Sequence, residues 1–468
     1  MFDVNRNNPI LRKSAVILAA VVFAAPQILS AETLRGALVK AYNSSGLLEQ
    51  NRALLRAADE DVAVAASAMR GVLGWASNIS RQKTQGLSQE TETVENAASV
   101  GLTASITLYD GGQNKYALAA AKEAVLSTRQ ALIGVEQRVL LTTVGAFMEV
   151  RRSRKTAILR QNNVQVILEE LRAAKDRFEV GEVTKTDVAL AEARLAASKS
   201  ALAVANGERV QAEELYKQTV GSLPKTLSVP GPLPKLVNSA AAAKKSAVQH
   251  HPDIIAIQHD IKQAEYNMKR AEGAFRPTVS LSSSLNYTDE AGDEFQRSGS
   301  IQLAAEGLIY TGGRLPALLR QATARRDAQR SILHLTRLRV EQEAGSAFAL
   351  LQMARAGREA SEEQIRASRV AFEGVREEAK VGARTTLDVL NAEQELLDAQ
   401  AGLISAESDE QIAAYRLLAQ MGKLTVDDLN LPVQKYDPLA YYDLVRQAPT
   451  LISKRGIRLD QVLKSISK

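Results

Sequence analysis

The chain has 468 residues, of which only 4% are aromatic, and Ala, Leu, Gln, Glu and Arg dominate long stretches of it. This composition favours long helices with thin apolar seams over a thick globular core. The absence of cysteine excludes disulfides, thiolate chemistry, cysteine-based zinc sites and a lipid-modified N-terminal cysteine. The formal net charge of +6 is modest, and we expect no nucleic-acid partner.

Residues 1–31 have the features of a targeting segment. Three basic side chains precede an apolar run, AVILAAVVFAA, that ends at Pro26. A spanning helix needs about 20 apolar residues, so the pattern predicts a secretory signal cleaved near Ala31 rather than a membrane anchor. No later segment has 18 consecutive apolar residues. We therefore expect the mature protein to meet a membrane through strands, if it meets one at all.

Two motifs occur twice at one spacing. VGEVTKTDVALAEA, which begins at Val180, returns 201 residues later as VGARTTLDVLNAEQ, which begins at Val381. ITLYDGGQNKYALAAA around Tyr109 matches GLIYTGGRLPALLRQA around Tyr310 at the same offset. A shared offset indicates a duplicated half, and each half should form one structural unit.

The first repeat, 32–221, begins with a predicted helix at 47–69. Two alternating segments, GVLGWASNISRQ and ASVGLTASITLY, predict a strand, a long polar loop and a second strand. From Gln113 to about Phe178 no Gly/Pro cluster interrupts the helical pattern, which predicts a helix about 98 Å long. A shorter return helix of about 36 residues then runs to Gly221.

The second repeat, 251–423, has the same order of elements. A helix at 252–274 precedes the predicted strands PTVSLSSSLNY and SIQLAAEGLIY. A second long helix runs from Arg314 to about Ala379, and a return helix ends at Gly422. Both return helices carry heptad rows of small residues, which permit close antiparallel packing. A soluble coiled coil would show the same rows, but it would not explain the strands.

Two segments lie outside the repeats: a Pro-rich linker at 222–250 and a tail at 424–468. We expect both to form a belt at mid-height. The first return helix and helix 252–274 together are about as long as one long helix. The second return helix and helix 47–69 together have a similar length. These sums predict end-to-end stacking in those two pairs, so that the repeats close around one another.

The four predicted strands are too few for a membrane barrel. A closed barrel needs at least about eight strands, because open edges cannot be satisfied in lipid. One chain cannot close such a barrel, so spanning strands would require oligomerisation. A small periplasmic β-domain is the competing interpretation of the same strands.

These features together resemble the TolC family of outer-membrane channel proteins. The resemblance rests on the signal segment, the duplicated half, LYDGG and IYTGG, FRPTVSL and the paired VG…T…D turns, and it runs from about Glu32 to about Leu429. The terminal VQKYDPLAYYDLVRQAP resembles the tail of a subset of that family. One departure is Gly71, which stands where the second repeat has Pro277.

The resemblance implies a mainly α fold with a small β part. Long antiparallel coiled-coil hairpins would form an α-barrel tunnel through the periplasm, and four strands per chain would enter a 12-stranded transmembrane β-barrel of a homotrimer in the outer membrane. It further implies a passive exit duct for drug efflux or type I protein secretion. A periplasmic adaptor and an inner-membrane transporter of the ABC or RND type would deliver the substrate.

The resemblance also assigns roles to the two turns. Adaptor tips would dock at Val180, Gly181, Val381 and Gly382. Glycine there permits backbone conformations or close approach that a side chain would block, and simple turn chemistry explains the same residues equally well.

The residues after the second turn resemble the family's gate. Asp388 and Asn391 lie three apart on one helix face, and threefold symmetry would turn each into a ring at the pore constriction. The family often has aspartate at both positions, so one anionic ring is missing here. Arg384 matches an arginine that ties the movable hairpin to its neighbour, with Thr186 and Asp187 as its candidate partners. The alternative is a solvated Arg and Asp near a helix start.

Ala379 occupies the place of a tyrosine that helps to close the gate in the family, so Arg384 would act with fewer helpers.

Other functions fit the sequence less well. A periplasmic coiled-coil adaptor or scaffold would also have long hairpins, but an adaptor usually has only one. No acid–base pair indicates an enzyme, because the many carboxylates are expected on solvated helix faces. His250 and His251 precede a helix start and predict a structural role rather than metal ligation. We expect no cofactor and no metal.

Overall fold

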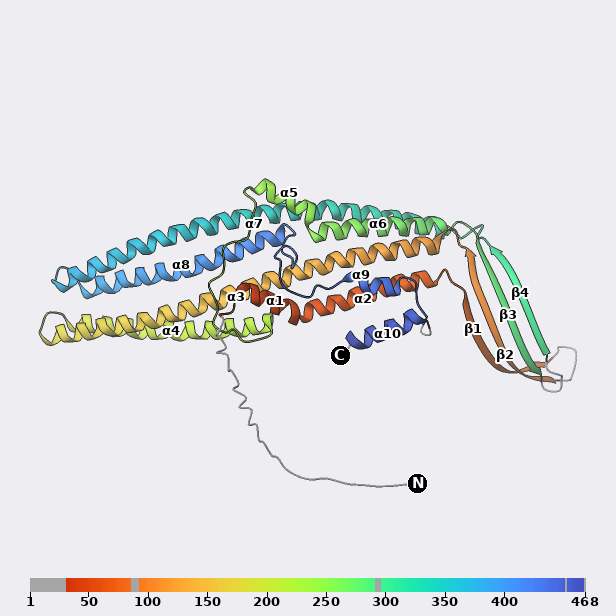
Figure 1. Ribbon diagram of the computed structural model, residues 1–468, viewed down its shortest axis with the longest axis horizontal. Helices are drawn as coiled ribbons and strands as arrows, with labels where there is room; N and C mark the ends of the chain where they lie inside the picture. The colour runs from red at the N-terminus through yellow and green to blue at the C-terminus, as the bar shows by residue number, and fades with distance from the viewer. Residues whose placement is uncertain (1–30, 86–91, 291–295, 451–452, 467–468) are drawn as a thin grey trace, which may run out of the picture.

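The computed structural model describes residues 31–85, 92–290, 296–450 and 453–466 (Figure 1). Apart from Ala31, the predicted signal segment lies outside the described residues. An elongated layer of helices carries a four-stranded sheet at one end, and two helical turns form the other end (Figure 1). We call these the barrel end and the tip end.

The two long helices span the whole helical body, as predicted. Helix α3 (Gln113–Glu179) and helix α7 (Arg314–Lys380) each have 67 residues. The shorter helices are α1 (Leu34–Ser44), α2 (Gly46–Ser67), α4 (Lys185–Val220), α5 (Ala240–His250), α6 (Pro252–Gly273) and α8 (Thr386–Gln420). Neighbours in the layer are α4–α3–α8–α7 in the tip half and α2–α3–α6–α7 in the barrel half. Helices α4 and α2 therefore form one edge of the layer, and α7 forms the other.

The predicted end-to-end stacking of the shorter helices is wrong. The end of α4 meets the junction of α1 and α2, where Ser44 Oγ donates to the Val220 carbonyl at 3.1 Å. The end of α8 meets the junction of α5 and α6, because the backbone of His250 lies against Gly422. Each return helix thus stacks within its own repeat. Lengths could not identify the partner, since α2 and α6 both have 22 residues.

Four short helices were not predicted from the sequence, and the first of them is α1, which precedes the predicted helix at 47–69. Helix α5 lies inside the 222–250 linker, and the tail contains α9 (Pro438–Val445) and α10 (Lys454–Ile466). Helix α9 packs along α2, where the Tyr441 hydroxyl donates to Glu60 Oε1 at 2.6 Å. The tail therefore lies against the α2 edge of the layer.

The largest core sits at mid-height, where the stacked helices meet. Phe147 of α3, Tyr216 of α4 and Leu417 of α8 are completely buried there. Burying a large apolar side chain contributes about 1.5–3 kcal/mol. This cluster therefore stabilises the packing of the helices more than the thin apolar seams on either side of it. Helix α3 is also long and apolar enough to cross a membrane, but half of its most apolar window is buried in this fold. Its packing identifies it as a core helix.

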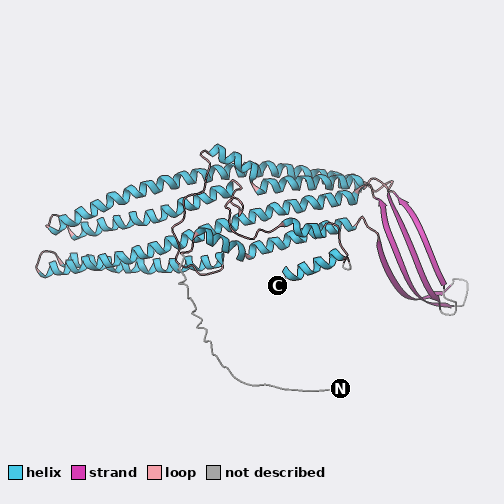
Figure 2. Ribbon diagram, viewed as in Figure 1, coloured by secondary structure: helices cyan, strands magenta, loops and turns pink. Residues whose placement is uncertain are grey.

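The sheet is antiparallel, with the order β1 (Val72–Gln85), β2 (Glu92–Tyr109), β3 (Thr278–Glu290), β4 (Gln296–Glu306) (Figure 2). The strands extend further into the polar segments than predicted, because paired strands continue after the apolar alternation stops. Strand β4 ends four residues before Tyr310, contrary to the prediction. Its partner β3 begins at Thr278, opposite Glu306, so no ladder is available beyond that point.

The two faces of the sheet differ in chemistry. One face is apolar and the other carries small polar residues. The apolar face includes Leu73, Trp75, Ile79, Val100, Leu102, Leu281, Leu285, Ile301 and Leu303, and the polar face includes Ser99, Thr103, Ser280, Ser282, Ser284, Ser300 and Gln302.

Nothing in the described chain covers the apolar face. Trp75 is 75% exposed and Ile301 is 81% exposed. The strands pack extensively only with one another, and the sheet projects beyond the helices (Figure 2). A soluble β-domain would bury such a face, whereas a lipid-facing barrel wall exposes it.

Candidate functional site

The candidate site is the tip end, where both helical turns have the same backbone. Gly181 has φ +79° and Gly382 has φ +77°, in the left-handed region that favours glycine. Behind each glycine the next amide bonds back into the helix: Glu182 N–H to the Arg177 carbonyl and Ala383 N–H to the Glu378 carbonyl, both at 2.9 Å. The duplicated sequence thus ends each long helix with the same left-handed turn.

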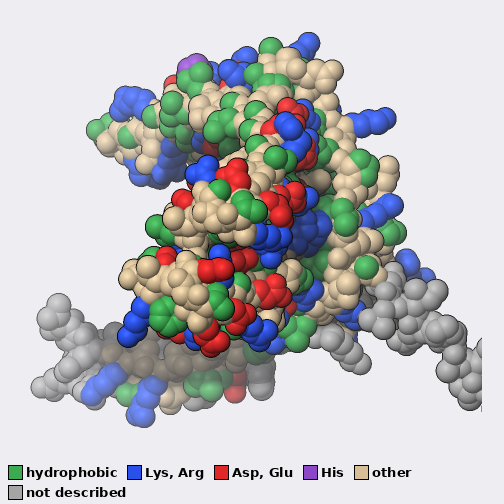
Figure 3. Space-filling model, turned by 90° about the vertical axis from the view of Figure 1, so that its left-hand side faces the viewer, with side chains coloured by type: hydrophobic (Ala, Val, Ile, Leu, Met, Phe, Trp, Pro, Cys, Tyr) green, Lys and Arg blue, Asp and Glu red, His purple; other side chains and the backbone are tan. Residues whose placement is uncertain are grey.

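The tips are open to solvent. A Cβ added at Gly181 or Gly382 would meet no atom within 4 Å. Val180 is 72% exposed and Val381 is 81% exposed. Within the chain the glycines therefore serve turn conformation rather than close packing. The tips present exposed apolar side chains, and acidic and basic groups intermix across the face seen from this end (Figure 3).

A capping box starts each return helix. Asp187 Oδ2 accepts from Thr184 N at 2.9 Å, and Thr184 Oγ1 accepts from Asp187 N at 3.3 Å. Thr385 and Asp388 repeat this arrangement at 3.0 and 3.2 Å. The hydrogen bonds from Thr385 lower the pKa of Asp388, so its carboxylate is ionised at neutral pH. Both aspartates therefore serve as helix caps.

Arg384 contacts its own hairpin. Its Nε donates to Glu378 Oε2 at 2.8 Å. The predicted partners lie elsewhere in the single chain: Thr186 is exposed and Asp187 is bonded to Thr184. The structure does not bring Arg384 to the first tip.

Asn391 is tied to the first hairpin. Its Oδ1 accepts from Arg194 Nη2 of α4 at 3.2 Å. Arg194 was missed by the sequence analysis. No pattern marks it, because the contact exists only once the two hairpins pack side by side.

A buried carboxyl lies two residues after Asn391 on α8. Glu393 is only 6% exposed, and its Oε1 accepts from Asn163 Nδ2 of α3 at 2.8 Å. Burial raises the pKa of Glu393 to about 7, with a further upward contribution from Glu170. Arg376 of α7 in turn pairs with Glu170 at 3.4 Å. The expectation that all carboxylates lie on solvated faces is therefore wrong for Glu393.

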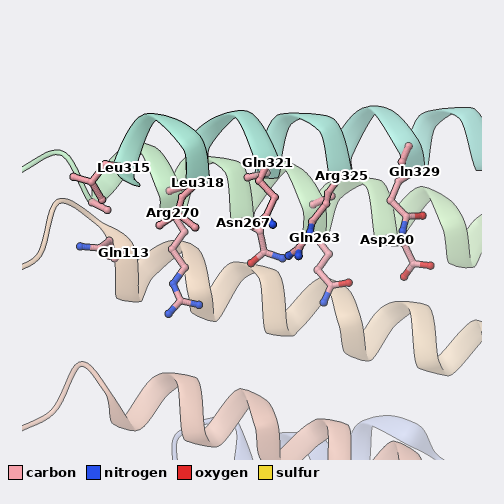
Figure 4. Close-up of a pocket in the computed structure, with 15 residues that line it drawn as sticks. Gln113, Asp260, Gln263, Asn267, Arg270, Leu315, Leu318, Gln321, Arg325 and Gln329 are labelled. Atoms are coloured by element: carbon pink, nitrogen blue, oxygen red, sulfur yellow. The ribbon is translucent and has the colours of Figure 1, made fainter. Parts of the chain in front are cut away.

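A cavity lies at the barrel end, between α6 and α7. It has a volume of about 670 Å³ and is lined by amide and charged groups, among them Gln263, Asn267, Gln321 and Arg325 (Figure 4). The side chains project from both helices into an open groove (Figure 4). Leucine and alanine side chains also line the groove, so its mixed lining indicates no particular ligand.

The histidines at the α5–α6 junction are part of the helix geometry. His251 Nδ1 accepts from Asp253 N at 3.3 Å and caps α6. Within the described ranges, no group of three or more His, Cys, Asp or Glu residues could hold a metal ion.

The sequence matches a family model described as "Outer membrane efflux protein" over residues 37–222 and 244–423. It is 39% identical to outer membrane efflux protein BepC of Brucella suis over 92% of this chain and 94% of that protein. Protein CyaE of Bordetella pertussis is 28% identical over 70% of this chain and 72% of its own length. The outer membrane channel CmeC of Campylobacter jejuni superposes with a TM-score of 0.77 at 16% identity, over 96% of this chain and 98% of CmeC.

Proposed function

This chain belongs to the outer membrane efflux protein family and is a non-enzymatic exit duct of the outer membrane, and from that premise we propose that three copies build the duct. The observation that carries the proposal is the sheet. It has one uncovered apolar face and two open edges, at β1 and β4. Pairing β1 of one copy with β4 of the next leaves no edge exposed to lipid, which a bilayer requires.

The helical layer supports the same head-to-tail assembly. Both of its edges expose large apolar side chains that a neighbouring copy would cover. The α7 edge has Leu335, Leu338, Met353 and Val370, and the opposite edge has Leu54 and Val64 of α2 and Val204 and Val210 of α4. The contact is heterologous, so it closes into a ring when the rotation between copies is one third of a turn. A periplasmic adaptor or scaffold would have no use for the apolar sheet.

The six tips of such a trimer would ring the entrance of the tunnel. We assign Val180, Gly181, Val381 and Gly382 as the docking surface of a periplasmic adaptor that connects the duct to an inner-membrane transporter. The support is their exposure and the absence of any intrachain contact around the glycines. An ABC-type or an RND-type transporter would both satisfy this arrangement.

The proposed gate uses the second tip. Asp388 is ionised and its Oδ2 is engaged by the cap, so a ring of three such residues would hold cations at the mouth. Arg384 would keep the closed arrangement by exchanging Glu378 for Thr186 or Asp187 of a neighbouring copy. Asn391, held by Arg194, contributes a neutral second ring.

Single-channel recording in planar bilayers tests the gate. Arg384→Ser should raise the conductance of the closed duct, and Asp388→Ala should reduce cation selectivity. Arg366→Ser is the matched control, because Arg366 forms a similar exposed pair with Glu363 on α7 away from the tip. If Arg384→Ser and Asp388→Ala both behave like the control, the constriction lies elsewhere.

A further inference from the structure

Three contacts join the first helical hairpin, α3–α4, to the second, α7–α8, near the tip end. Asn163 bonds Glu393, Arg376 pairs with Glu170, and Arg194 bonds Asn391. We call this set the interhairpin seam. Any movement of one hairpin away from the other must break it.

Glu393 is the member of the seam whose hydrogen-bonding capacity is not satisfied. Its Oε1 accepts one hydrogen bond, whereas its Oε2 is buried with no hydrogen-bond partner among the described residues. Burying a carboxylate whose acceptor oxygen lacks a hydrogen bond costs much free energy, and burying the neutral carboxylic acid costs much less.

The charges that face Glu393 come from three helices. Glu170 of α3 disfavours a second negative charge, while Arg194 of α4 and Arg376 of α7 favour it. Arg376 is also paired with Glu170, which reduces its help to Glu393. Burial therefore remains the largest influence on the pKa of Glu393 and raises it.

We propose that Glu393 is a positioning residue of the duct: its neutral carboxyl holds the second hairpin against the first through Asn163, and its ionisation loosens the interhairpin seam. Opening hydrates the carboxylate, which removes the cost of burial. The inference rests on the gate proposed above and makes its opening depend on the protonation of Glu393.

The direction of the pH dependence follows from the sign of the shift. The pKa of Glu393 is about 7 in the closed seam, against an ordinary value of 4.5 that a hydrated, open seam would restore. The closed state therefore has its full stability from this group below pH 4.5 and loses it as the pH rises through 7. Between pH 6 and pH 8 the open-to-closed ratio of each of the three seams should rise about tenfold.

Open probability measured in planar bilayers from pH 5 to pH 9 tests this. Glu393→Gln keeps the size and the bond to Asn163 but cannot ionise, so its duct should stay closed and lose the rise between pH 6 and pH 8. Glu395→Gln is the matched control, because Glu395 is exposed two residues away on the same helix. It should keep the wild-type profile.

A second variant tests whether the charge next to Glu393 sets the midpoint of the pH profile. Glu170→Gln removes the neighbouring negative charge, so the midpoint of the profile should move to lower pH. If Glu393→Gln and wild type share one profile, or Glu170→Gln leaves the midpoint in place, the inference is wrong. The gate is judged separately: if Arg384→Ser opens the duct while Glu393→Gln changes nothing, only the role of Glu393 fails.

Discussion

The assignment of the two sheet faces can be tested with one pair of neighbouring residues. Leu102 on β2 lies on the apolar face, between Trp75 and Leu285 of the flanking strands, and is 50% exposed. Thr103 points to the opposite face. Leu102 lies near the middle of the strand, where an arginine facing lipid costs about 2–4 kcal/mol. Leu102→Arg should therefore destabilise a trimer by about 6–12 kcal/mol, because the cost recurs in each copy.

Thr103→Arg is the matched change. It places the same side chain in the water-filled lumen, so assembly should be normal and only conductance should change. Denaturant unfolding in lipid vesicles, with trimer recovery on semi-native gels, measures the difference. Equal losses in the two variants, or a greater loss in Thr103→Arg, would refute the assignment of the lipid face.

Two further predictions concern the tip and the helical body. Gly382→Asn tolerates the left-handed backbone, whereas Gly382→Val does not, so both should impair export if the tip docks an adaptor, but only the valine variant should do so if turn geometry alone matters. Asp59 is fully buried and burial raises its pKa to about 6, so its contribution to stability is complete below pH 3.8 and is lost as the pH rises through 6. Asp59→Asn should therefore make the thermal stability depend less on pH. Thermal unfolding of detergent-solubilised trimers at pH 5 and pH 8 measures this, and a loss of stability in Asp59→Asn as large as in the wild type would contradict the prediction.

The features that the sequence predicted are those with a local cause. The long helices follow from about 65 residues without a Gly/Pro cluster, and the tips follow from a glycine that ends one helix and a Thr/Asp box that starts the next. The strands follow from alternation, and their number alone requires a multi-chain barrel in lipid. The family confirms the fold and the function that these patterns indicated.

The features that were missed depend on which elements become neighbours. The stacking of α4 on α2 rather than α6 leaves no trace in length, and α9 is too short for its periodicity to stand out. The burial of Glu393 is the clearest case. Glu192 holds the same position in the first repeat, yet its side chain is 54% exposed and pairs with Lys175. Helix α8 lies between α3 and α7, whereas α4 lies at the edge of the layer.

That difference predicts a contact between copies. In a ring of three, the edge helix α4 lies beside α7 of the next copy, just as α8 lies beside α3. The residue 201 positions after Asn163 is Gln364, which is exposed on α7 and again offers an amide. Glu192 should therefore meet Gln364 of the neighbouring copy as Glu393 meets Asn163. The chain has no cysteine, so introduced pairs are unambiguous. With a short thiol crosslinker, cysteines at 192 and 364 should join separate chains, while cysteines at 163 and 393 should react within one chain. Reaction of the second pair without any chain-to-chain product from the first would contradict this ring.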